Sequence, residues 1–278
     1  MGVQISNPLE GIRYIPIDSL PPMKGIIPEL RDGLCKMGNV AVCFSGGLDS
    51  TVLLANAIDA LPDSHLAVMI DMPILSERQR CAAIRIADFL GTRLITVRLS
   101  WKDLVELMDN GPERCYYCKK TIYSNVRRVA EEHGFTNIAA GENIDDKETE
   151  RPGRRAGTEE SIINPLLDLG IGRSVIEETV KKMGLPVCMI KDTCMATRFP
   201  TDMPIDEEKV RMAEDCERTI RMNTGVRQLR IKFREEEAVL LTDPDEICKL
   251  DDNRDLVRKI LRTKGVESIR IDPDGYTG

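Results

Sequence analysis

The sequence predicts an α/β fold, a doubly wound parallel sheet with helices on both faces, followed by a small α+β domain. Two observations carry this prediction. Between residues 24 and 140, short apolar runs of strand length alternate with longer segments whose apolar residues recur at helical spacing. After residue 202 the pattern becomes helix, strand, strand, helix, strand. We therefore expect a first domain at residues 1–202 and a second at residues 203–278, the latter for substrate binding or oligomerisation.

The elements of the first domain are expected in regular alternation. The residues before Lys24 show no period and predict an extended lead-in. Residues 141–172, dense in charge and glycine, and residues 188–201, without a period, predict loops. Strands are expected at 40–44, 66–70, 94–97 and 136–140, and helices at 24–36, 49–60, 76–90, 101–108, 115–133 and 173–183.

Three polar or glycine positions follow directly on predicted strands, namely Ser45, Asp71 and Gly141. Parallel strands end at one edge of a sheet, and ligands in such sheets bind at that edge. We expect these positions to converge there. In the second domain, a helix is expected at 205–223, strands at 226–233 and 237–242, a helix at 253–263 and a strand at 268–271.

The fold is organised around the turn that follows the first strand. Apolar residues from Val40 run into Ser45-Gly46-Gly47-Leu48-Asp49-Ser50, and a helix follows at once. Gly46 and Gly47 permit a tight turn and a close approach of backbone N–H groups to a ligand. Asp49 or Ser50 is the expected helix cap, and a helix N-terminus after such a loop is an anion site. The absence of Gly-Lys-Ser/Thr excludes the Walker type. The pattern therefore favours a phosphate-binding loop over an ordinary strand-to-helix turn.

Composition narrows the class of protein. Across 278 residues the formal net charge is −7, which indicates no long nucleic-acid surface. No apolar run approaches twenty residues and no signal-peptide segment is evident, so we expect a cytoplasmic protein without a membrane partner. Nine cysteines in an intracellular chain argue against a disulfide framework. Two histidines leave little room for a zinc site built on His.

The cysteines offer several readings. Cys115 and Cys118 form a C-x-x-C at the start of a predicted helix, where the helix dipole and neighbouring cations favour thiolates. A thioredoxin-type disulfide would need the motif directly after a strand. A structural zinc would need two further thiols, and Cys188 and Cys194 are the next along the chain. Cys115, Cys118 and Cys194 would suit a [4Fe-4S] cluster with one open iron. Free thiols are the remaining possibility.

Several stretches together resemble one known family. Ser45–Ser50 is similar to the SGGxDS PP-loop of the ATP pyrophosphatases, which adenylate a substrate and release pyrophosphate. The whole set is identified as that of the LarE-type ATP-dependent sulfur transferases, which make the thio groups of the nickel-pincer nucleotide cofactor. The matching stretches are Ser45–Ser50, Arg114–Lys119, Gly141–Asp146, Arg151–Gly153, Pro165–Leu167, Cys194–Arg198 and Ile271–Tyr276.

The resemblance implies a set of roles. ATP and Mg²⁺ are the expected cofactors, with Asp49 on Mg²⁺ and a catalytic part for Asp49, Cys194 and Arg198. A nucleotide-like substrate with a carboxylate or carbonyl, and sulfide or another sulfur donor, are the expected partners. Lys102 is a further candidate for neutralising phosphate. Homo-oligomers form through the family's small domain. The positions expected to bind ATP are Ser45, Gly46, Gly47, Asp49, Ser50, Met69, Asp71 and Gly141.

The family has two branches of sulfur chemistry. In one, a single cysteine in the Cys194 region gives up its own sulfur and becomes dehydroalanine. In the other, three cysteines hold a [4Fe-4S] cluster that relays sulfide. With Cys115, Cys118 and Cys194 present, the chain resembles the cluster branch. It departs from the family at Arg230-Ile231-Lys232-Phe233, where members read Arg-x-Arg followed by His to bind the substrate phosphate. Arg230 and Lys232 alternate on one strand face and are expected to hold a phosphate still.

Three other functions remain as alternatives. A tRNA thiolase with the same PP-loop and cluster chemistry would need a basic RNA face, and the charge of −7 argues against it. An amide-forming ligase related to NAD or GMP synthetases would leave the three cysteines without a role. A nucleotide-binding regulator without enzymatic activity is the third alternative.

Overall fold

The computed structural model describes residues 24–148, 152–184, 192–235 and 237–276. These residues form two compact units. The first contains the described parts of residues 1–72, 77–100 and 115–190, and the second contains those of residues 73–76, 101–114 and 191–278. A domain is a segment that folds on its own, which compactness alone does not establish. The division into residues 1–202 and 203–278 therefore stays a prediction.

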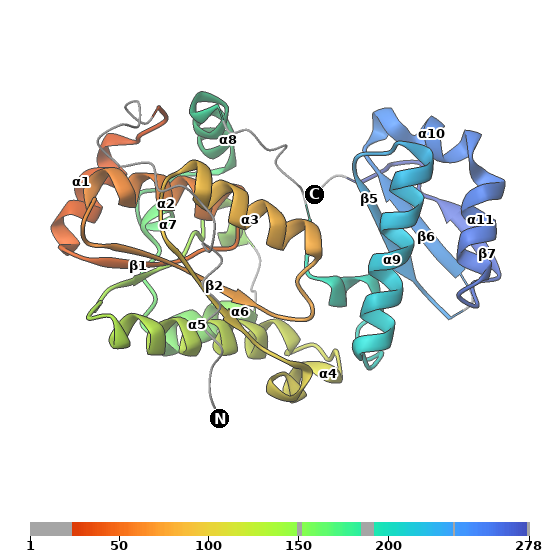
Figure 1. Ribbon diagram of the computed structural model, residues 1–278, viewed down its shortest axis with the longest axis horizontal. Helices are drawn as coiled ribbons and strands as arrows, with labels where there is room; N and C mark the ends of the chain where they lie inside the picture. The colour runs from red at the N-terminus through yellow and green to blue at the C-terminus, as the bar shows by residue number, and fades with distance from the viewer. Residues whose placement is uncertain (1–23, 149–151, 185–191, 236, 277–278) are drawn as a thin grey trace. The chain divides into compact units, whose positions relative to one another are not determined.

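The first unit is built on a four-stranded parallel sheet (Figure 1). Its strands are β1 (Val40–Cys43), β2 (His65–Asp71), β3 (Leu94–Arg98) and β4 (Ile138–Ala139), in the order β3-β2-β1-β4. The chain moves outward from β1 through β2 to β3 and returns on the other side of β1 as β4. The strand order thus reverses between β1 and β4, and the edge beyond this pair is where a doubly wound sheet binds its ligand.

Helices cover both faces of this sheet, which confirms the predicted α/β class (Figure 1). α5 and α6 lie on one face, and α1, α2 and α3 lie on the other. α2 packs against α1, α7 and α8 as well as against β1 and β2, and this explains why every position from Ser50 to Ile58 is buried. The helices of the unit are α1 (Pro28–Met37), α2 (Leu48–Ala60), α3 (Glu77–Phe89), α5 (Arg114–Glu132), α6 (Pro152–Glu159), α7 (Pro165–Asp168) and α8 (Arg173–Met183).

The second unit has a small mixed sheet in the order β5-β6-β7. β5 (Leu229–Phe233) and β6 (Glu237–Thr242) are antiparallel, and β7 (Ser268–Ile271) is parallel to β6. The helices are α4 (Val105–Met108), α9 (Glu207–Thr224), α10 (Ile247–Asp252) and α11 (Arg254–Arg262). Asp206 caps α9 by accepting a hydrogen bond from the N–H of Lys209, and Gly225 ends the helix in the left-handed conformation. This sheet and its helices confirm the predicted α+β character.

The predicted loop at residues 141–172 is wrong, because the structure has α6, α7 and a 3₁₀ turn at Ile144–Glu148 there. α6 buries Gly153, Ala156 and Gly157 instead of large apolar side chains. Such a helix has no apolar stripe to mark its period, so the sequence pattern does not show it. α10 is also missing from the sequence prediction. Of the second predicted loop, residues 188–191 lie outside the described residues, and Met195–Arg198 forms a 3₁₀ turn.

Across the ranges that the structure describes, no helix combines the length and the apolar character needed to cross a membrane.

Candidate functional site

The turn between β1 and α2 is held by its own hydroxyl groups. The N–H of Ser45 donates to Ser50 Oγ at 3.3 Å, and the N–H of Gly47 donates to Ser45 Oγ at 3.3 Å. Ser50 Oγ in turn donates to the carbonyl of Gly47 at 3.1 Å. Gly46 has a φ of +74°, and a Cβ there would lie 2.6 Å from the Cα of Ala83 on α3. Only glycine fits this position, and the loop is therefore pressed against α3 in one shape.

The start of α2 leaves backbone donors without a side-chain cap. Gly47 is the N-cap residue, and it has no side chain with which to cap the first turn. The expectation that Asp49 or Ser50 caps this helix is wrong, because both lie inside it and Ser50 Oγ bonds back to Gly47. Uncapped N–H groups at the start of a helix of 13 residues, together with the helix dipole, attract an anion.

Gly141 meets this loop from the end of β4. A Cβ on Gly141 would lie 2.8 Å from the N of Ser50 and 2.9 Å from the carbonyl carbon of Asp49, so the two backbones approach as closely as glycine allows. Asn143 Nδ2 donates to Asp49 Oδ1 at 3.2 Å. The fold thus brings the strand ends after β1 and β4 together at the point where the strand order reverses. Asn143 belongs to the site, and sequence reasoning assigned it no role.

The Asp49 carboxyl group lies in a setting that suits a cation. Burial raises its pKa above the ordinary value, and nearby Asp146 raises it further, while Arg173 and the Asn143 hydrogen bond lower it. The protein offsets only part of the desolvation cost of this half-buried carboxylate. A bound metal ion would stabilise it further, because the positive charge of the metal favours the ionised form. Oxygen ligands of this kind suit Mg²⁺. The residues present therefore fit a magnesium ion beside the loop.

Met69 and Asp71 lie at the end of β2. Met69 is buried, and the Asp71 carboxylate is paired with Arg80 at 2.7 Å and with Arg98 at 3.3 Å. The main-chain carbonyl of Asp71 accepts a hydrogen bond from the N–H of Leu99. These bonds hold the strand end in place. The part of Met69 and Asp71 in binding adenine stays a prediction.

Cys115 and Cys118 lie in the first two turns of α5. Cys115 is exposed and Cys118 is half-buried, and a spacing of three residues puts them on one side of the helix. Cys194 belongs to the second unit, where it precedes the 3₁₀ turn Met195–Arg198. Among the described residues, no group of three or more His, Cys, Asp or Glu side chains is gathered tightly enough to hold a metal ion. The three-thiol cluster site stays a prediction.

Arg198 is fully buried in the second unit. Its guanidinium pairs with Asp192 at 2.7 Å and with Glu217 at 2.8 Å, and it donates to the carbonyl of Thr193 at 2.9 Å. These bonds join the turn after Cys194 to α9. Arg198 therefore has a structural role that was not predicted from the sequence. Its catalytic role stays a prediction.

Two other predicted phosphate contacts also lie in the second unit. Lys102 is an exposed residue in the 3₁₀ turn Trp101–Asp103. Arg230 lies on β5 with its Nε buried and without a hydrogen-bond partner among the described residues, and its guanidinium lies 5.5 Å from the ring centre of Tyr276. A buried donor of this kind suits an anion, so the phosphate role proposed for Arg230 from the sequence remains open to test.

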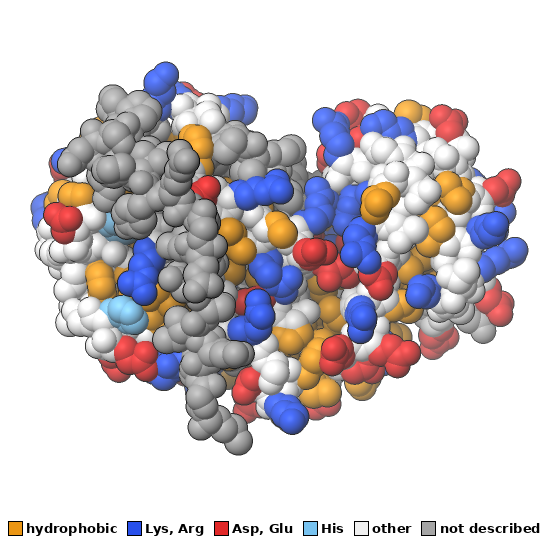
Figure 2. Space-filling model, viewed as in Figure 1, with side chains coloured by type: hydrophobic (Ala, Val, Ile, Leu, Met, Phe, Trp, Pro, Cys, Tyr) orange, Lys and Arg blue, Asp and Glu red, His pale blue; other side chains and the backbone are white. Residues whose placement is uncertain are grey.

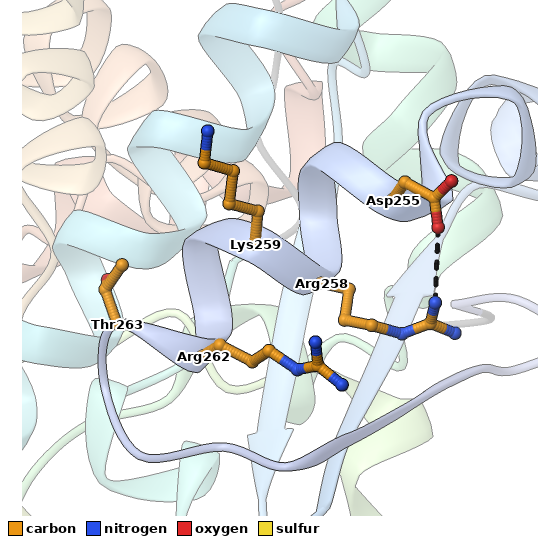
Figure 3. Close-up of a pocket in the computed structure, with 5 residues that line it drawn as sticks. All are labelled: Asp255, Arg258, Lys259, Arg262 and Thr263. Atoms are coloured by element: carbon orange, nitrogen blue, oxygen red, sulfur yellow. Dashed lines mark hydrogen bonds and ion pairs between the residues drawn. The ribbon is translucent and has the colours of Figure 1, made fainter.

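The surface of the second unit also has an open depression along α11, of about 520 Å³, drawn in Figure 3. Its lining residues come from this one helix and its end, and Arg258 is already paired with Asp255 at 3.2 Å. It is an exposed charged surface rather than an enclosed site. The lining residues are Asp255, Arg258, Lys259, Arg262 and Thr263.

No family model matches the chain. An uncharacterised protein of Methanocaldococcus jannaschii is 27% identical over 241 residues, which cover 87% of this chain and 92% of that protein. The pyridinium-3,5-bisthiocarboxylic acid mononucleotide synthase of Lactiplantibacillus plantarum is 24% identical over 253 residues, or 90% of each chain. The chain is thus similar to this synthase over nine-tenths of both lengths.

A shorter similarity relates the chain to a sulfurtransferase. The tRNA-cytidine(32) 2-sulfurtransferase of Cereibacter sphaeroides is 30% identical over 139 residues, which cover 44% of this chain and 46% of that enzyme. The names of these two relatives describe the synthesis of a bisthiocarboxylic acid and the transfer of sulfur to a tRNA cytidine. This agrees with the LarE-type resemblance that Ser45–Ser50 and the cysteine stretches indicate.

Proposed function

We propose that the protein is an ATP-dependent sulfur transferase that adenylates a carboxylate or carbonyl oxygen of a nucleotide-like acceptor and replaces AMP with sulfur. The observation that carries the proposal is the meeting of the Ser45–Ser50 loop with Gly141 where the strand order reverses. Support comes from a relative aligned over 90% of the chain whose name describes a bisthiocarboxylic acid mononucleotide.

The loop residues bind and orient ATP in this proposal. The backbone N–H groups of the loop and of the first turn of α2 surround the pyrophosphate. Asp49, oriented by Asn143, would hold Mg²⁺, which when bound would supply positive charge to the leaving pyrophosphate. The acceptor oxygen displaces pyrophosphate from the α-phosphorus, which gives an acyl or imidoyl adenylate. Preorganised donors stabilise the charge that develops in this step.

The cysteines supply the sulfur-carrying group. Cys115, Cys118 and Cys194 would hold a [4Fe-4S] cluster, and the two thiols near the start of α5 suit such a centre because iron–sulfur clusters prefer thiolate ligands. When bound, the cluster supplies the sulfur atom that replaces AMP. A homo-oligomer and a cytoplasmic location belong to the same proposal.

Exchange of radiolabelled pyrophosphate into ATP tests the adenylation step. Asp49→Ala should reduce the exchange rate by at least about a hundredfold, because loss of a metal-binding carboxylate removes several kcal/mol of charge stabilisation. Asp88→Ala, an exposed position near the end of α3, serves as the control and should exchange like the unaltered protein. Undiminished exchange by a folded Asp49→Ala protein would exclude the ATP site.

A tRNA thiolase is a second candidate, favoured by the similarity to the tRNA-cytidine(32) 2-sulfurtransferase over 139 residues. The net charge of −7 argues against it. On the face drawn in Figure 2, Lys and Arg side chains stand beside Asp and Glu on each unit instead of forming one basic surface. Incubation with ATP, sulfide and either bulk tRNA or a pyridinium carboxylate mononucleotide separates the two: the proposal requires thiolation of the mononucleotide, and thiolation of tRNA alone would reject it.

A further inference from the structure

A group of charged side chains lies at the carboxyl edge of the first unit's sheet. Lys119 comes from α5, directly after Cys118. Glu142 directly follows Gly141, and Arg154 comes from α6. Lys119 Nζ lies 3.6 Å from Glu142 Oε1, and Arg154 Nε lies 3.8 Å from Glu142 Oε2. One carboxylate thus faces two cations, at distances longer than the roughly 2.8 Å of a direct charge-assisted hydrogen bond.

One N–H donor group of the Arg154 guanidinium makes no hydrogen bond within the described residues. Its side chain is 34% exposed, yet Nη2 is buried and has no hydrogen-bond partner in the described part of the chain. A buried donor left without an acceptor costs about 1–3 kcal/mol. The planar guanidinium fork matches a carboxylate or a phosphate better than any other partner. The missing acceptor is therefore best supplied by an oxyanion.

Lys119 is held in place before any ligand arrives, and the helix that carries Arg154 packs closely against the Lys119 helix. Lys119 Nζ donates to the hydroxyl of Tyr123 at 3.0 Å, and Tyr123 is 1% exposed. α6 lies close against α5 because Gly153 has no side chain: a Cβ there would lie 2.9 Å from Lys119 Cγ and 3.4 Å from the carbonyl oxygen of Cys115. Fixed donors bind an oxyanion without first losing rotamer entropy.

The position of the group connects it with the proposed chemistry. Glu142 follows the glycine that touches Ser50 of the phosphate loop, and Lys119 follows Cys118 of the C-x-x-C turn. An oxyanion bound by Lys119 and Arg154 would adjoin both.

We propose that Lys119 and Arg154 form an oxyanion subsite, with Glu142 holding both cations in place when the subsite is empty. The inference rests on the proposed function for the origin of its ligand. Two reactants of that function carry the required chemistry, the carboxylate of the acceptor and the phosphate of the adenylate. The structure assigns the oxyanion, and a binding experiment distinguishes its two sources.

The experiment uses pairs of ligands that differ in the oxyanion. Isothermal titration calorimetry measures the affinity of the full chain for nicotinic acid mononucleotide against nicotinamide mononucleotide, and for AMP against adenosine. Arg154→Gln should weaken binding of one oxyanion ligand by about tenfold to a hundredfold, the loss expected for one charge-assisted hydrogen bond, and leave its neutral counterpart unchanged. Arg155→Gln, the neighbour that is 56% exposed, is the matched control and should bind like the unaltered chain.

The two arms assign the source of the oxyanion. A selective loss for nicotinic acid mononucleotide places the acceptor carboxylate in the subsite, and a selective loss for AMP places the adenylate phosphate there. The proposal is overturned if Arg154→Gln binds both oxyanion ligands as the unaltered chain does. It is equally overturned if the unaltered chain prefers neither oxyanion ligand over its neutral counterpart.

A second variant should change the affinity for the oxyanion ligand in the opposite direction. Its test does not depend on whether Arg154→Gln folds. Glu142→Gln removes the carboxylate that competes for the two cations, so it should strengthen binding of the same oxyanion ligand by several-fold. Unchanged or weaker binding by a folded Glu142→Gln protein contradicts the subsite. Failure of the proposed function would appear separately, as absent ATP–pyrophosphate exchange in an unaltered chain that still prefers the oxyanion ligands.

Discussion

Asp49 combines a cost in stability with a proposed metal-binding role. Its carboxyl group is half-buried at the start of α2, where one hydrogen bond from Asn143 only partly replaces water. Functional sites commonly retain groups that the fold alone would not favour, because a ligand completes their environment.

We predict that Asp49→Asn stabilises the protein in the absence of Mg²⁺. The folded pKa of Asp49 is raised by burial above the unfolded value of about 3.9, so the folded chain binds this proton more tightly than the unfolded chain. This contribution is fully present below the unfolded pKa and is lost as pH rises through the folded pKa. The free energy of unfolding of Asp49→Asn should therefore exceed that of the unaltered protein by an amount that grows with pH. Urea unfolding between pH 4 and pH 8 measures this difference. An advantage that shrinks as pH rises would contradict the buried-carboxylate account.

Gly141 shows how a single hydrogen atom in place of a side chain shapes the site. Gly141→Ala should destabilise the protein by about 1–3 kcal/mol, because its Cβ would meet backbone atoms of Asp49 and Ser50 that cannot move aside. It should also weaken ATP binding by displacing the loop. Gly33→Ala, in α1 with open space around it, is the matched control and should stabilise by about 0.5–1 kcal/mol. Equal effects of the two substitutions on urea unfolding would count against the close approach.

At the scale of elements, Glu246 ties the start of β5 to α10. This buried carboxylate accepts hydrogen bonds from the N–H groups of Arg227 and Gln228 and from Lys249 Nζ at 2.7 Å. Burial alone would raise its pKa, but the Lys249 bond and the two backbone N–H groups outweigh it and lower the pKa to about 2. Like a helix-capping residue, Glu246 supplies a side-chain acceptor to backbone N–H groups, here those that precede β5.

We predict that Glu246→Gln destabilises the protein by about 2–3 kcal/mol at neutral pH, the range for lost charge-assisted hydrogen bonds. A lowered folded pKa means that the contribution of Glu246 is present above its unfolded value of about 4.3 and is lost as pH falls toward about 2. The gap between the two proteins in chemical unfolding should therefore narrow below pH 4. A gap that stays constant with pH would show that the carboxylate charge has no part in this contact.

At the scale of the molecule, the proposed chemistry needs residues from both units. Cys115 and Cys118 come from the first unit and Cys194 from the second. In the second unit, the turn after Cys194 is anchored by the buried pairs of Arg198 with Asp192 and Glu217. Because removing one partner of a buried ion pair costs about 3–5 kcal/mol, this anchor keeps the Cys194 turn in a defined place within its unit.

We predict that Ala in place of any one of Cys115, Cys118 or Cys194 removes most of the brown absorbance of anaerobically prepared protein and all thiolation. Cys188→Ala, whose position lies outside the described residues, is the control and should keep both. Iron and acid-labile sulfide analysis measures the outcome. About one bound zinc and no iron, or loss of the cluster in Cys188→Ala, would reject the three-thiol cluster.

The alternation of strands and helices could be read from the sequence because it is a local property. Val40–Phe44 is apolar throughout, and apolar residues recur at helical spacing in Arg173–Met183. The pattern within each segment therefore predicts its secondary structure. The glycines of Ser45–Ser50 likewise indicate a phosphate loop from a few adjacent residues. The short helix α6 was not predicted, because its buried residues Gly153, Ala156 and Gly157 form no apolar stripe.

Tertiary structure alone decided which distant groups meet. Gly141 touches Ser50, Arg198 pairs with Glu217, and Lys119 and Arg154 face Glu142. Each of these contacts joins different elements of the fold. The same arginine has the same sequence signature whether it lies in solvent or in a buried ion pair. Its role follows from burial and from its partners, and those are set by how the elements pack rather than by the residues beside it in the chain.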